Sequence, residues 1–102
     1  MESGPNQNKF QQELKFIEQE NAIKKAETHR NLDRAIKDAQ SRRDNQLINL
    51  EGQVAEKILE EIKSNTENQI TDLLEKSAEE LERADKDLAI EIDKLKRKHN
   101  IK

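Results

Sequence analysis

Residues 59–99 read LEEIKSNTENQITDLLEKSAEELERADKDLAIEIDKLKRKH, and their spacing is the clearest indication of secondary structure in the chain. Its apolar and small residues recur in steps of three, four and four, so the pattern repeats every eleven residues. Side chains spaced by three and four lie on one face of an α-helix. The positions on this track are Leu59, Ile62, Thr66, Ile70, Leu73, Ser77, Leu81, Ala84, Leu88, Ile92, Leu95 and His99. The stretch therefore predicts a long helix with one apolar stripe.

An earlier track with the same stepping is displaced from this one by a single residue. It visits Ile36, Ala39, Arg43, Leu47, Leu50, Val54 and Ile58. Where the two tracks meet, the doublets Leu47/Ile48, Val54/Ala55 and Ile58/Leu59 widen the stripe. An eleven-residue repeat has about 3.67 residues per turn, so paired helices wrap with a right-handed twist or stay nearly straight. Before Ile36 the stripe is poorer, because Asn21, Lys25 and Thr28 occupy the extrapolated positions.

The composition argues against a globular core. Only 31% of the 102 residues are hydrophobic while 40% are charged, and the aromatic residues are Phe10 and Phe16. The chain has no cysteine, which excludes a disulfide framework and a thiolate metal site. Pro5 is the only proline, and Gly4 and Gly52 are the only glycines, so strong helix breakers are rare. These features indicate an all-α, elongated protein.

We therefore predict a flexible leader over residues 1–7 and a single long helix over 8–100. Its seam is weaker over 8–35 and stronger over 36–99, and it forms an extended, right-handed coiled coil with a partner chain. The alternative is a folded-back helical bundle, with turns at 41–45 and 64–68. The sequence favours the extended helix because neither of these segments contains glycine or proline.

The predicted partner-helix interface consists of the aliphatic residues on the two tracks. They are Ile36, Ala39, Leu47, Leu50, Val54, Ile58, Leu59, Ile62, Ile70, Leu73, Leu81, Ala84, Leu88, Ile92 and Leu95. Charge is uneven along the chain: residues 24–43 carry seven basic and three acidic residues, whereas 51–82 carry three basic and ten acidic residues. This asymmetry favours a different chain as the partner, in an orientation that brings opposite charges together.

The sequence predicts neither a catalytic site nor a cofactor or metal site. His29 and Asp33 lie one helical turn apart, but a third ligand is not apparent, and His99 has no local partner. The acidic middle and the lack of stacking aromatics disfavour nucleic-acid binding. No apolar run approaches the roughly 20 residues of a membrane span, so membrane contact is expected only through a complex. A small-molecule substrate is not expected either.

The segment LKFIEQENAIKKA, residues 14–26, is similar to the start of the E-type stalk subunit of rotary ATPases. In its length, its eleven-residue repeat and its interleaved charge, the chain as a whole resembles the helical peripheral-stalk subunits of V-type and A-type rotary ATPases. These are called G in some members and F or H in prokaryotic ones.

The resemblance implies a stator that pairs with the E-type stalk subunit as a heterodimeric coiled coil and links the catalytic head to the membrane sector. It further implies a role in hydrogen-ion transport, in the cytoplasm and peripheral to a membrane. The alternative is a generic coiled-coil scaffold or adaptor.

Overall fold

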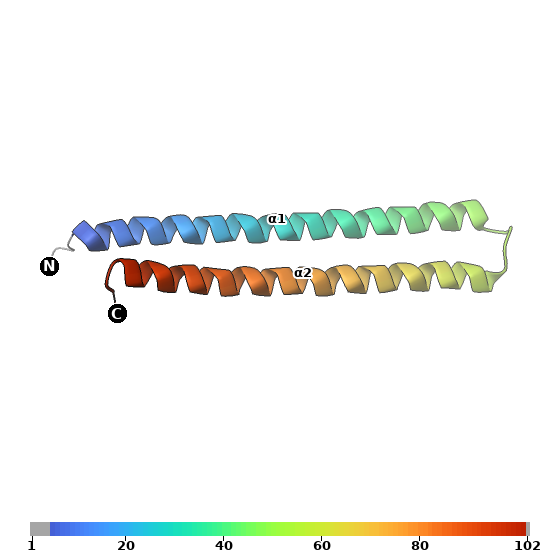
Figure 1. The fold of residues 1–102 in the computed structure, drawn as a ribbon. Coiled ribbons are helices and arrows are strands. Elements are labelled where there is room, and N and C mark those ends of the chain that lie inside the picture. The colour runs from blue at the N-terminus through green and yellow to red at the C-terminus, as the bar shows by residue number, and fades with distance from the viewer. Residues whose placement is uncertain (1–4, 102) are drawn as a thin grey trace. The chain divides into compact units, whose positions relative to one another are not determined.

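Residues 5–101, which the computed structural model describes, form two α-helices and no strand. Helix α1 spans Pro5–Leu50 and helix α2 spans Glu56–Lys98 (Figure 1). The all-α prediction is thus confirmed. Helix α1 begins at a proline, whose fixed φ and missing N–H suit the first helical position. It starts three residues before the predicted position 8, and residues 1–4 of the predicted leader lie outside the described residues.

The prediction of one unbroken helix over 8–100 is wrong, because the chain turns at residues 51–55. Gly52 has a φ of 77°, in the left-handed region that glycine enters without a Cβ penalty. The end of α1 is closed by backbone hydrogen bonds from Glu51 N to Leu47 O and from Gln53 N to Leu50 O, both 2.9 Å.

The turn explains why the two apolar tracks are displaced by one residue. A one-residue displacement rotates the stripe by about 100° around a continuous helix, so a straight seam could not follow both tracks. With a turn between them, each helix directs its own stripe at the other. The displacement, together with Gly52, is the sequence signal that could have located the turn.

The alternative prediction of turns at 41–45 and 64–68 is also wrong, since both segments lie inside helices. The serine and threonine residues near 64–68 do not cap a helix start. Thr66 is buried, and its hydroxyl donates to the carbonyl of Ile62 at 3.0 Å, one turn earlier in the same helix. This bond satisfies the hydroxyl without ending the helix.

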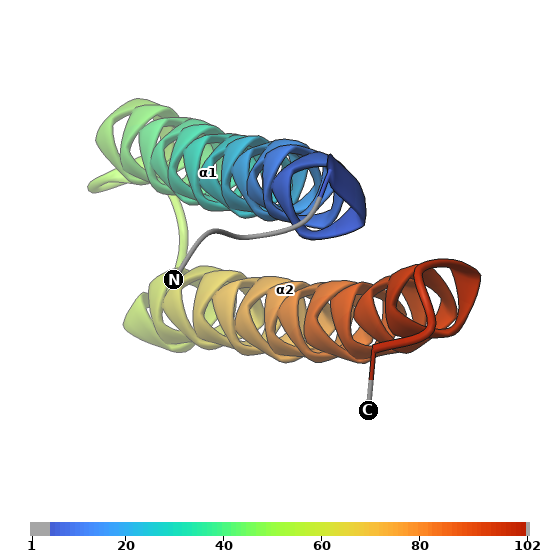
Figure 2. The same cartoon turned by 90° about the vertical axis from the view of Figure 1, so that its left-hand side faces the viewer.

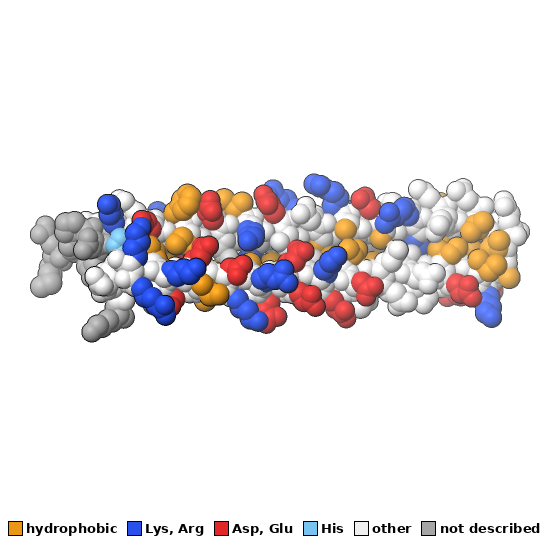
Figure 3. All heavy atoms as spheres, in the orientation of Figure 1, with side chains coloured by type: hydrophobic (Ala, Val, Ile, Leu, Met, Phe, Trp, Pro, Cys, Tyr) orange, Lys and Arg blue, Asp and Glu red, His pale blue; other side chains and the backbone are white. Residues whose placement is uncertain are grey.

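The chain packs as two compact units. In unit 1, the part of α1 up to Thr28 lies antiparallel to the part of α2 from Glu80 onward (Figure 2, blue and red). Unit 2 covers His29–Glu79 and contains the turn with the helix segments on either side of it. In each unit, side chains from the two helices meet along one stripe, and charged side chains cover much of the outer surface (Figure 3).

The inward face of α2 follows the second track. All of its positions from Leu59 to His99 are buried or half-buried, and the other described residues of α2 are exposed. On α1 the inward positions include Asn21, Lys25 and Thr28, which the sequence places on the same stepping. The core is thin, because two helices cover only one stripe of each other. The most buried apolar side chains are Phe10, Ala39, Ala84 and Leu95.

Candidate helix-pairing interface

Of the fifteen residues predicted to bind a partner helix, fourteen are buried or half-buried in the structure. Residues 36–73 of this set belong to unit 2, whereas Leu81, Ala84, Leu88, Ile92 and Leu95 belong to unit 1. In both units the opposing helix of the same chain covers them. In unit 2 the predicted residues of α1 thus lie against those of α2, whereas Leu81 to Leu95 lie against residues of α1 that precede Ile36 and are outside the predicted set.

Ile58 is the exception, with 43% of its surface exposed. Ile58 is the last position of the first track, but it lies in α2, where the residues of the second track face inward. Its neighbour Leu59 takes the inward position and is half-buried. A side chain one residue away points about 100° around the helix, so Ile58 faces outward.

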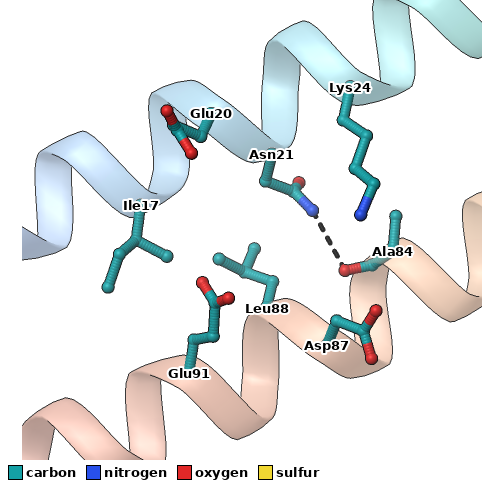
Figure 4. Close-up of a pocket in the computed structure, with 8 residues that line it drawn as sticks. All are labelled: Ile17, Glu20, Asn21, Lys24, Ala84, Asp87, Leu88 and Glu91. Atoms are coloured by element: carbon teal, nitrogen blue, oxygen red, sulfur yellow. Dashed lines mark hydrogen bonds between the residues drawn. The ribbon is translucent and has the colours of Figure 1, made fainter.

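A polar contact joins the helices in the middle of unit 1. The side-chain amide of Asn21 donates from Nδ2 to the backbone carbonyl of Ala84 at 3.0 Å (Figure 4). A polar side chain that is partly withdrawn from water needs a hydrogen-bond partner, and the half-buried Asn21 finds it on the opposing helix. Sequence reasoning treated Asn21 as an interruption of the seam, whereas the structure uses it as a cross-helix contact.

A small pocket surrounds this contact. It is lined by Ile17, Glu20, Asn21, Lys24, Ala84, Asp87, Leu88 and Glu91. Figure 4 shows the side chains of Ile17 and Leu88 between the helices, with the carboxylate of Glu91 beside Leu88. One turn further along α1, Lys25 forms an ion pair with Asp85 of α2. Both side chains are partly exposed, at 34% and 58%, so this pair adds little stability and acts mainly on alignment.

A second cross-helix cluster lies where the end of α2 meets the start of α1. His99 Nε2 lies 2.6 Å from Glu13 Oε2, and Lys98 Nζ donates to Glu13 Oε1 at 3.2 Å. The ring of His99 packs edge-on against Phe10 with centroids 6.0 Å apart. The sequence offers His99 no local partner, and its partner Glu13 lies 86 positions away along the chain. The antiparallel arrangement brings His99 to residues near the start of the chain.

The pKa of Glu13 is lowered from its ordinary value of 4.5. Its hydrogen bond with His99 is the largest cause, and the hydrogen bond from Lys98 is the next. Both favour the ionised carboxylate. The cluster therefore couples the pairing of the helix ends to the charge of one carboxyl group.

The candidate metal residues do not converge. His29 and Asp33 are both exposed, and the described residues contain no cluster of three or more potential metal ligands. Over the described part of the chain, neither helix is long and apolar enough to cross a membrane. Comparisons with protein families, with characterised proteins and with solved structures find no match to this chain.

Proposed function

We propose that this chain is a non-catalytic structural protein that works as a coiled-coil scaffold or adaptor by packing further helices beside its own helix pair. The observation that supports this proposal is the burial pattern: the apolar stripes of α1 and α2 are buried or half-buried mainly where the two helices pack against each other. Polar cross-helix contacts at Asn21 and Glu13 align the two helices in unit 1.

The thin core supports the binding of another helix. The inward aliphatic residues are mostly half-buried rather than buried, so part of their apolar surface still faces water. A third helix lying along the seam would bury more of that surface, at about 25 cal/mol per Å². The proposed partner is therefore a helical protein chain with an amphipathic face.

A second candidate is the stator role, with the E-type stalk subunit of a rotary ATPase as the partner and a location peripheral to the membrane. The stepping of three, four and four among the inward residues favours it, because this spacing suits a right-handed or nearly straight coil. In this role the helix pair would open, and the stripes of α1 and α2 would pair with the partner chain instead.

A covalent lock separates the two roles. Because the chain has no cysteine, a Lys25→Cys/Asp85→Cys variant can be joined by a short bismaleimide across the two helices of unit 1. Binding to this cross-linked, or locked, form is then measured. The probes are the proteins captured by the chain without the cross-link and the purified E-type stalk protein. The scaffold role predicts that the locked pair still binds its partner.

The stator role predicts the opposite, because a locked pair cannot release its stripes. The matched control is an Asp93→Cys/Arg97→Cys variant, in which the same reagent joins two positions one turn apart on α2. This control carries the reagent without tying α1 to α2. Loss of binding in the locked form but not in the control would reject the scaffold role, in which the partner binds while α1 and α2 remain paired.

A further inference from the structure

Unit 1 carries an apolar groove on its outer surface. The groove contains about 410 Å³ of space and is lined by Gln12, Glu13, Phe16, Ile17, Leu95 and Lys98. It adjoins a second hollow that shares Ile17, Leu95 and Lys98 and adds Glu91 and Lys94. Phe16 is 61% exposed, although folding usually buries most of the surface of a large aromatic side chain.

The turn of unit 2 carries a complementary set of exposed apolar residues. Ile58 is 43% exposed and Ile48 is 70% exposed, while Ala55 is exposed and Val54 half-buried. Hydrophobic side chains gather at this end of the described surface in Figure 3. Gly52 at the tip of the turn has no atom within 4 Å of where a Cβ would lie, so the tip is open. Exposed apolar groups of this kind mark interaction surfaces when they cluster.

The stretches of chain that carry the two surfaces have opposite net charge, although the charged residues that line the groove and its neighbouring hollow, Glu13, Glu91, Lys94 and Lys98, balance one another. Around the groove, residues 8–17 and 91–101 contain six Lys or Arg and three Asp or Glu, which gives a net charge of +3. Around the turn, residues 48–61 contain four Glu and one Lys, which gives a net charge of −3. An acidic, apolar segment therefore matches the apolar lining of the groove and the net positive charge of the chain around it.

We propose that the groove in unit 1 binds the turn of unit 2 from a second copy of this chain. Ile58 and Val54 of one copy would lie against Phe16 and Leu95 of the next, and the turn's glutamates would face lysines such as Lys94. The contact is heterologous, since each copy presents two different surfaces. Such contacts extend into open chains of molecules unless the geometry closes into a ring.

This proposal goes beyond the scaffold role and does not rest on it, because a chain that self-associates need not bind another protein. The contact is small, so we expect weak association that is visible between roughly 10 µM and 1 mM. Added salt weakens it, because the charges around both surfaces are exposed and screened.

Sedimentation equilibrium of two complementary variants tests the proposal. Phe16→Ser/Lys94→Glu alters the groove and leaves the turn intact, whereas Ile58→Ser/Glu61→Lys alters the turn and leaves the groove intact. We expect wild-type mass to rise beyond that of a dimer with concentration, and each variant alone to associate at least about tenfold more weakly. An equimolar mixture should form a one-to-one dimer and nothing larger, because only one intact groove and one intact turn can meet.

The control is Ile90→Ser/Glu79→Lys, which makes the same chemical changes at exposed positions outside both surfaces. It should associate like the wild type. Circular dichroism verifies that each variant is folded. If a variant does not fold, a synthetic peptide of residues 47–61 replaces it, and this peptide should inhibit the self-association of the wild-type chain. A wild-type chain that stays monomeric up to 1 mM would overturn the proposal, as would a dimer that the mixed variants fail to restore.

Discussion

At the scale of single residues, a few polar contacts join the helices of unit 1 along a seam whose most buried side chains, Phe10, Ala84 and Leu95, are apolar. Asn21 bonds to the Ala84 carbonyl, and Glu13 bonds to His99 and Lys98. A polar residue in a helix seam specifies alignment at some expense of stability, because only one register satisfies it. These residues therefore act on how the helices pair more than on how strongly they pair.

Replacing Asn21 by leucine should separate alignment from stability. We expect Asn21→Leu to raise the midpoint of thermal unfolding, since an aliphatic side chain buries more apolar surface at the same half-buried position. The register should become less unique. Bismaleimide cross-linking from a cysteine at position 25 to cysteines placed singly at 81, 85 and 88 should then lose its preference for 85. A lower midpoint with unchanged cross-linking would contradict this assignment.

Acid should remove the contribution of Glu13. Its pKa is lowered in the folded chain, so its stabilising effect is present above the ordinary value of 4.5 and is lost as the pH falls through the lowered folded pKa. We expect Glu13→Gln to melt below the wild type at pH 7, and the difference to begin shrinking below pH 4.5 and to vanish once the pH lies below the lowered folded pKa. A Glu18→Gln control, at an exposed site on the same helix, should track the wild type throughout. A gap that persists in acid would show that the carboxylate charge is not responsible.

At the scale of elements, the turn between α1 and α2 depends on one backbone conformation. Gly52 has a φ of 77°, and a Cβ at this position would meet open space. The effect of a substitution is therefore conformational rather than steric.

We expect Gly52→Ala to lower the free energy of unfolding by about 1 kcal/mol, as for other residues forced into the left-handed region. Gly52→Asn should lose less, because asparagine tolerates this region. Urea unfolding measures both. Equal losses would indicate that something other than φ governs position 52.

At the scale of the whole molecule, the pairing of α1 with α2 within one chain makes unfolding independent of a second chain. We expect the thermal midpoint, followed by circular dichroism, to be the same at two low micromolar concentrations, below the range of the proposed self-association. A coiled coil that requires a partner copy would instead melt at a higher temperature when more concentrated, because its folding is coupled to association. Such a shift would contradict pairing within the chain.

The sequence alone determined that the chain is helical and which face of each helix points inward. Periodic spacing is a local property, so the second track identified every inward position of α2, and the first track, extrapolated toward the N-terminus, placed Asn21, Lys25 and Thr28 on the stripe of α1. Only the tertiary structure decided what covers that stripe. The contacts of Asn21 with Ala84 and of Glu13 with His99 join residues 63 and 86 positions apart, which meet only once the chain turns at Gly52. A helix of the same chain or of another chain can cover an apolar stripe equally well, because burial of apolar surface does not depend on chain connectivity.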